Sequence, residues 1–122
     1  MHKFPKVLML YSEYGQERRS VSIQNSARHL FKTRGVLLEE LDGSAESNNE
    51  KRNKLWTLCD KSIARGSYPQ FFAESPDSTV WLGDWDTITS LNDAHDIPPS
   101  FLYKHPEIIT FTKRFKGFMK YK

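Results

Sequence analysis

The sequence holds one sulfur nucleophile, Cys59, and its chemistry raises the first question about function. A cysteine thiolate attacks disulfides and can be capped by glutathione. A single cysteine cannot form an internal disulfide, which argues against a disulfide-stapled secreted scaffold and fits a reducing compartment. Two interpretations of Cys59 stay open: a small buried residue of the core, or a lone thiol for glutathionylation or a mixed disulfide.

Residues of other common catalytic and metal sites do not gather along the chain. The four histidines are scattered without the spacing of a metal site. There is no glycine-rich phosphate loop, and residue order alone does not support a Ser-His-Asp set. We therefore expect no metal ion and no catalytic residue of these classes.

Two tryptophans and two aspartates lie close together in residues 81–86. Asp84 or Asp86 can cap a following helix, because aspartate is a favoured N-cap residue. We expect Trp81 to pack in the core and Trp85 to lie at the surface, where an aromatic side chain can anchor a partner.

The basic charge of the chain is concentrated at its C-terminal end. Residues 1–100 carry 12 Lys and Arg against 14 Asp and Glu, a balance of −2, and residues 101–122 carry six against one, a balance of +5. In residues 106–122 apolar residues recur at near-helical spacing between the cations. One interpretation is a final helix packed on the domain, at least over 108–115. The others are an arm for an acidic partner, an anionic membrane surface, a calmodulin-like groove or a nucleic acid. The basic residues that would make such contacts include Lys113, Arg114, Lys116, Lys120 and Lys122.

The first half of the chain predicts a βαβ unit. Residues 7–11 are continuously apolar, as a strand buried on both faces should be. Apolar residues at helical spacing predict a helix over 18–34, which Gly35 can end. Residues 36–42 predict a second strand, parallel to the first.

The second half predicts a helix, two strands and a further helix. Ser47 and Glu50 fit a capping box for a helix over 49–63, with Cys59 on its inner face. Residues 68–73 and 79–82 predict an antiparallel hairpin, followed by a helix through residue 91. This order predicts an α/β fold: a four-stranded mixed sheet flanked by helices on both faces, in the layout of thioredoxin and glutaredoxin. We assign residues 1–97 to this domain and residues 98–122 to a basic amphipathic extension.

Four segments add a family resemblance. Residues 66–72, Gly-Ser-Tyr-Pro-Gln-Phe-Phe, resemble the Thr-Val-Pro-Gln-Val-Phe segment of glutaredoxins, and residues 82–86, Leu-Gly-Asp-Trp-Asp, resemble the Gly-Gly-x-Asp segment that follows it. Together with the polar helix residues 50–56 and the segment 11–15, they are similar to the SH3-domain-binding glutamic-acid-rich-like family. The resemblance covers roughly residues 6–93.

The resemblance implies a glutaredoxin-type fold that has lost its catalytic cysteines. The Cys-x-x-Cys position falls near residues 16–19, Gln-Glu-Arg-Arg, which hold no sulfur. It implies a cis Pro69 that leaves the backbone of Tyr68 to pair with an extended peptide, near Gln16. It also places Trp85 and Asp86 where glutaredoxins hold the glutamyl end of glutathione, although Asp86 can equally be a helix cap.

These observations predict a non-catalytic adaptor that binds a protein or an extended peptide. One alternative is a glutathione- or thiol-peptide-binding protein that uses Cys59. Another is a membrane- or nucleic-acid-associated protein that works through its basic tail. SH3-domain binding is not expected, because only Tyr68-Pro69 remains of a proline-rich ligand. No apolar run approaches the ~20 residues of a membrane span, so the expected location is cytoplasmic. The sequence does not indicate the oligomeric state.

Overall fold

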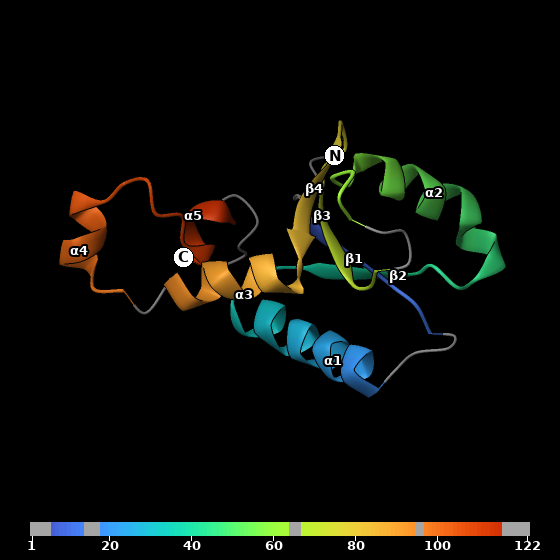
Figure 1. Ribbon diagram of the computed structural model, residues 1–122, viewed down its shortest axis with the longest axis horizontal. Helices are drawn as coiled ribbons and strands as arrows, with labels where there is room; N and C mark the ends of the chain where they lie inside the picture. The colour runs from blue at the N-terminus through green and yellow to red at the C-terminus, as the bar shows by residue number, and fades with distance from the viewer. Residues whose placement is uncertain (1–5, 14–17, 64–66, 95–96, 116–122) are drawn as a thin grey trace.

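The computed structural model describes residues 6–13, 18–63, 67–94 and 97–115, and Figure 1 shows its arrangement. The elements in chain order are β1 (Lys6–Tyr11), α1 (Arg18–Thr33), β2 (Leu38–Asp42), the 3-10 turn η1 (Glu46–Asn48), α2 (Asn49–Leu58), β3 (Gln70–Glu74), β4 (Thr79–Asp84), α3 (Trp85–Asp93), α4 (Pro99–Lys104) and α5 (Phe111–Arg114).

The strands form one four-stranded mixed sheet in the order β2-β1-β3-β4. The pair β1–β2 is parallel, and the pairs β1–β3 and β3–β4 are antiparallel. The parallel pair is joined through α1, as the βαβ pattern requires. The predicted α/β class and the mixed sheet are confirmed.

Helices cover both faces of the sheet, and the alternation along β1 explains why. Val7 and Met9 point to one face and Leu8 and Leu10 to the other, and all four are fully buried. The first face packs against α1, α3 and α5, and the second against α2 (Figure 1). The continuously apolar β1 is therefore the centre of two cores.

The C-terminal extension contributes to the first core. Phe111 and Phe115 are both fully buried, with their ring centroids 5.6 Å from that of Phe31. The predicted packing of residues 108–115 is confirmed for these two side chains and is wrong for Ile109, which is 48% exposed. The division of the chain at residue 97 stays a prediction, but side chains beyond it complete the core.

Several local predictions need correction. The capping box is wrong: Ser47 lies inside η1, and α2 begins after Asn48 without a side-chain cap. The helix α2 ends at Leu58, so Cys59 follows it as the C-cap residue. The second strand begins at Leu38, two residues later than predicted, and α4 was not predicted.

The predicted caps at the end of α1 and at the start of α3 are confirmed. Gly35 ends α1 with a positive φ of 73°, and its N–H donates to the carbonyl of Lys32 at 3.1 Å. Asp84 is the N-cap of α3, and its carboxylate accepts the N–H of Thr87 at 3.1 Å. Among the described residues, no helix is both long and apolar enough to cross a membrane.

Candidate functional site

Most of the expected binding residues meet at one end of the sheet. The strand register places Asp42 beside Tyr11, and it places Gln70 between Leu10 and Asp84. Residues 68–69 precede β3 and residues 85–86 open α3, so both pairs lie at this same end. The predicted candidates therefore share a surface that the chain assembles from separate segments.

The Tyr68–Pro69 peptide bond is cis, as the resemblance implies. Pro69 is buried and Tyr68 is half-buried. Within the described part of the chain, no hydrogen bond joins the main chain of Tyr68 to another residue. An N–H and a carbonyl oxygen at the sheet end are therefore left without a described partner.

Two contacts hold the side chain of Tyr68. Its ring lies edge-on to Trp56 of α2, with the centroids 5.5 Å apart. Its hydroxyl group reaches Gly43, where a methyl group in place of the glycine hydrogen would lie only 3.0 Å from the hydroxyl oxygen. Any larger residue at position 43 would press on this tyrosine, so Gly43 permits the close approach.

Gln70 fixes the segment that leads into Pro69, although its position just inside β3 gave no sign of this role. Its side chain is 1% exposed, and its Nε2 donates to the carbonyl of Ser67 at 2.8 Å. Its Oε1 accepts the indole N–H of Trp81 at 2.9 Å. The buried amide therefore ties the loop before Tyr68 to β4. Trp81 packs half-buried against the second core, in line with its predicted place there.

Asp42 organises the neighbouring turn. Its carboxylate oxygen accepts the N–H of Glu13 at 3.0 Å and both the N–H and the hydroxyl of Ser44, at 2.9 and 2.6 Å. Partial burial raises the pKa of Asp42, but the hydrogen bonds from Ser44 and Glu13 outweigh it and hold the pKa below its usual value. The turn around Gly43 is therefore held by an ionised carboxylate.

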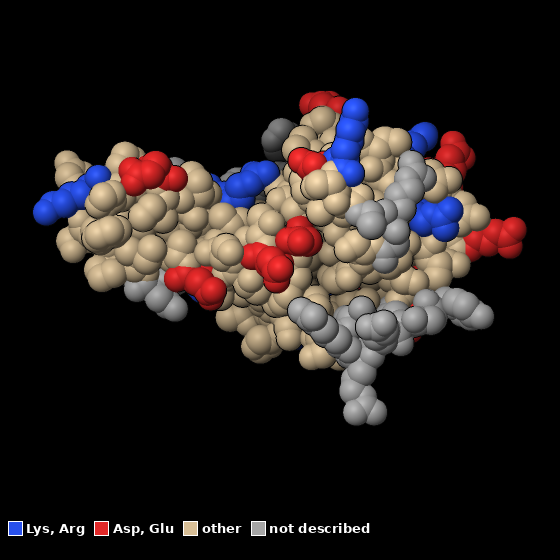
Figure 2. Space-filling model, viewed as in Figure 1, with Lys and Arg blue, Asp and Glu red and all other residues tan. Residues whose placement is uncertain are grey.

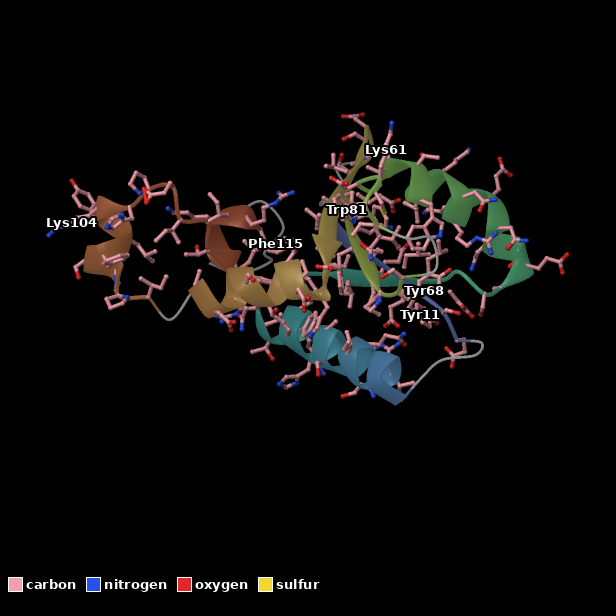
Figure 3. All side chains as sticks on the ribbon, in the orientation of Figure 1. Tyr11, Lys61, Tyr68, Trp81, Lys104 and Phe115 are labelled. Carbon is pink, nitrogen blue, oxygen red and sulfur yellow. The ribbon has the colours of Figure 1, made fainter. Side chains whose placement is uncertain are left out.

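Tyr11 is a residue of this region that sequence reasoning did not select. The guanidinium of Arg28 lies 5.7 Å from the centre of its ring, and Arg28 in turn pairs with Glu40 at 2.6 Å. Burial, followed by the nearby charge of Asp42, raises the pKa of Tyr11. Figure 3 shows Tyr11 and Tyr68 toward the same end of the molecule. Its place as the last residue of an apolar strand was the available signal.

The structure separates the roles predicted for residues 84–86. Asp84 caps α3, whereas Asp86 is exposed, and its main-chain oxygen accepts the hydroxyl groups of Thr89 and Ser90. The prediction that Trp85 lies at the surface is wrong in part. Its half-buried ring packs against the first core, 6.2 Å from Phe71, because α3 begins directly over the sheet.

Gly83 brings α3 this close to the sheet. Its φ is +131°, and a methyl group added there would lie 2.7 Å from the side chain of Thr87. The register shifts at this point, with Phe71 opposite Gly83 and Phe72 opposite Trp81, so Leu82 is the extra residue of a bulge. The bulge and the glycine turn β4 directly into the capped start of α3.

Cys59 lies on the second face of the sheet, after the end of α2. It is half-buried against the core of that face, and its Sγ is 3.7 Å from the carbonyl oxygen of Leu55. Burial raises the pKa of the thiol, which lowers the thiolate fraction at neutral pH. The position lies between the two earlier interpretations: a packed residue that keeps partial exposure.

The remaining predicted residues either lie on α5 or fall outside the segments that the structure describes. Lys113 and Arg114 are exposed on α5, and the Nζ of Lys113 donates to the carbonyl of Ile108 at 3.2 Å. Predictions for four other residues fall outside the described segments: Gln16, Lys116, Lys120 and Lys122.

A cavity of about 420 Å³ begins at Arg28, beside Tyr11, and sequence reasoning missed it. Its walls come from α1 and the residues that open β2, including Arg28, Lys32, Val36, Leu37 and Leu38. Because β2 ends at Asp42, most of this cavity lies toward the opposite end of the strand.

Across the segments that the structure describes, no three His, Cys, Asp or Glu side chains group as metal ligands would. Comparison of the chain with family models, with curated proteins and with solved structures finds no match.

Proposed function

We propose that this chain is a non-catalytic adaptor with a thioredoxin-like fold of the glutaredoxin type, similar to the SH3-domain-binding glutamic-acid-rich-like family. In this proposal it binds an extended segment of a partner protein at the sheet end that holds Tyr68 and Pro69. The fold assignment is supported by the strand order β2-β1-β3-β4, with one parallel pair and helices on both faces.

The observation that carries the binding proposal is the main chain of Tyr68. No hydrogen bond to it is found among the described residues, and β3 begins only two residues later. An extended peptide laid beside it can pair with both its N–H and its carbonyl, as in strand addition. Each such bond contributes about 1 kcal/mol net.

The surroundings of Tyr68 favour a rigid docking point over a flexible one. Trp56 and Gly43 hold its ring, and Gln70 holds the carbonyl of Ser67 just before it. A partner segment therefore orders only itself on binding, which lowers the entropic cost of the complex.

Cys59 supports the non-catalytic part of the proposal. It is the only sulfur nucleophile of the sequence, it packs against the core of the α2 face, and burial raises its pKa. Thiol–disulfide exchange is fastest for an accessible thiol whose pKa lies near the working pH. The chain offers a half-buried thiol with a diminished thiolate fraction.

A peptide with blocked amides tests the main-chain pairing. A twelve-residue peptide is selected from a random library on the immobilised chain, and single N-methyl groups are then placed along it. We expect one N-methyl group, at the amide that faces the Tyr68 carbonyl, to weaken binding about five- to tenfold. The matched control is the next amide, which points away from the chain in an extended peptide.

Nuclear magnetic resonance locates the peptide independently. We expect the amide signals of Tyr68 and Gly43 to move on titration and those of Leu37 and Leu38, at the cavity, to stay. Movement confined to the cavity, or an N-methyl scan without any sensitive amide, would disprove binding at this site. Displacement of the peptide by reduced glutathione, lost in Asp86→Ala, would favour the thiol-binding alternative.

A further inference from the structure

The chain makes an excursion between α3 and α5 that stands apart from the sheet. We call residues 97–109, which include α4, the arm. The chain leaves the domain after α3 and returns at Thr110 and Phe111, which are both buried. Figure 1 shows α4 far from the strands, beyond α5. The arm is therefore anchored at both of its ends.

The arm exposes large apolar side chains. Tyr103 is 89% exposed, and Phe101 and Ile109 are each 48% exposed. The ring of Phe101 stacks on the imidazole of His105, with centroids 4.3 Å apart, so an aromatic pair lies at the surface. Apolar surface gathered on one projecting segment is the usual mark of an interaction site.

Counted over the arm and α5 together, three cations stand against one acidic residue. Lys104 ends α4, and Lys113 and Arg114 follow on α5, all exposed. Lys113 reaches back to the carbonyl of Ile108, which keeps its ammonium group beside the arm. The one acidic residue of the arm is Glu107, which is paired with His105 at 3.1 Å.

Figures 2 and 3 show the same distribution on the surface. The lobe around α4 consists mainly of atoms that are neither acidic nor basic, and Lys104 lies at its outer tip. Phe115 points inward, toward the core. In Figure 2 the basic tip of this lobe lies beside an acidic patch, and uncharged atoms make up most of the rest of the lobe.

We propose that the arm docks on an anionic lipid surface. Exposed aromatic and aliphatic side chains partition into the region between headgroups and acyl chains, and neighbouring cations bind the anionic headgroups. Phe101 and Ile109 supply the apolar part, and Lys104, Lys113 and Arg114 supply the charge. Tyr103 suits the interface, because its ring is apolar and its hydroxyl is polar.

The chemistry of the arm favours lipid over other partners. Besides its aromatic rings, the arm exposes aliphatic Ile109 together with Pro98 and Pro99, apolar surface that a lipid interface buries and that base stacking does not use. A second copy of the arm would bring the same cations together, and like charges repel. An anionic bilayer matches both the apolar and the basic part, and this inference does not depend on the peptide site at Tyr68.

Co-sedimentation of the full chain with vesicles tests the proposal. The probes are vesicles of phosphatidylcholine alone and vesicles that also contain phosphatidylserine. We expect binding to the anionic vesicles that weakens as sodium chloride is raised, since salt screens the headgroup charge. Binding that is equal on both kinds of vesicle, or absent from both, overturns the proposal.

Variants separate the apolar and the basic contributions. Phe101→Ser with Ile109→Ser should lower binding at least about tenfold, through the loss of apolar burial. Lys104→Gln should lower it about fivefold. The matched control is Val80→Ser on β4, which removes a side chain that is 52% exposed and lies away from the arm, and should leave binding unchanged. An effect of Val80→Ser equal to that of the arm variant would contradict the assignment.

A fluorescent side chain on the arm shows where the chain contacts the vesicle, whatever the affinity. In Tyr103→Trp the indole should become shielded from aqueous quenchers when anionic vesicles are added. No change in quenching while the chain sediments with the vesicles would place the contact elsewhere and overturn the proposal. If vesicles do not bind, tight binding of a single-stranded RNA would also overturn the proposal. Self-association that Ile109→Ser abolishes would overturn it as well, in favour of a second copy of the chain.

Discussion

The last quarter of the chain holds two aromatic segments of similar composition and opposite fate. Phe111, the first residue of α5, and Phe115, its C-cap residue, are fully buried beside Phe31. In the arm, Phe101 and Tyr103 remain exposed, although they lie only ten and eight residues before Phe111 in the sequence. Apolar content alone therefore does not decide whether a segment packs: Phe111 and Phe115 join the core between α1 and α3, and Phe101 and Tyr103 do not.

The largest expected effect tests the buried half of this comparison. Phe115→Ala removes a fully buried ring that contacts Phe31 and Phe111, and should lower the free energy of unfolding by about 3–5 kcal/mol. Urea denaturation measures this change. Phe115→Leu keeps most of the volume and should cost under about 1.5 kcal/mol. Equal losses in the two variants would mean that ring volume is not what α5 contributes.

A smaller effect is expected at the helix from which the arm departs. Asp84→Ala removes the N-cap of α3, where the carboxylate accepts both the N–H and the hydroxyl of Thr87 at 3.1 Å. It should lower the free energy of unfolding by about 1 kcal/mol. The control is Asp86→Ala, two residues later and exposed, with an expected loss of a few tenths. Thermal denaturation compares the two, and a larger loss for Asp86→Ala would reassign the cap.

The core of the fold could be predicted because its signals are local. The unbroken apolar run of β1 indicated burial on two faces, and Gly35 and Asp84 marked helix ends through their own backbone and side-chain chemistry. The capping box at Ser47 failed because the chain inserts a 3-10 turn there, which moves the start of α2.

The sheet-end site could be predicted only in part, because its contacts join distant segments. Tyr68 and Pro69 were selected through a resemblance, but the approach of the Tyr68 hydroxyl to Gly43 depends on how the loops fold over the sheet. The role of Gln70 depends on Trp81, eleven residues away. Residue type gives no sign of such partners. Trp85 was misplaced for the same reason, since its burial depends on the turn at Gly83.

Acid titration should test the polar contacts that Asp42 makes at the sheet end. The folded state holds the pKa of Asp42 below its ordinary value, because the hydrogen bonds from Ser44 and Glu13 outweigh the effect of burial. A lowered folded pKa contributes stability above the unfolded pKa, near 4, and this contribution is lost as the pH falls through the folded value. We expect the free energy of unfolding to decrease from about pH 5 downward, and to decrease less steeply in Asp42→Asn. An unchanged slope in that variant would assign the pH dependence to other carboxylates.

The smallest expected effect concerns the exposed half of the comparison. Phe101→Ala should change the free energy of unfolding by less than about 0.5 kcal/mol, because the ring is already 48% exposed and its stacking partner, His105, lies on the same arm. Urea denaturation beside Phe115→Ala measures both rings under one condition. A loss of several kcal/mol in Phe101→Ala would mean that the arm folds back on the domain in solution, and the exposed surface offered to a lipid would then be absent. A near-zero loss leaves that aromatic surface free for a partner, since the fold does not need it.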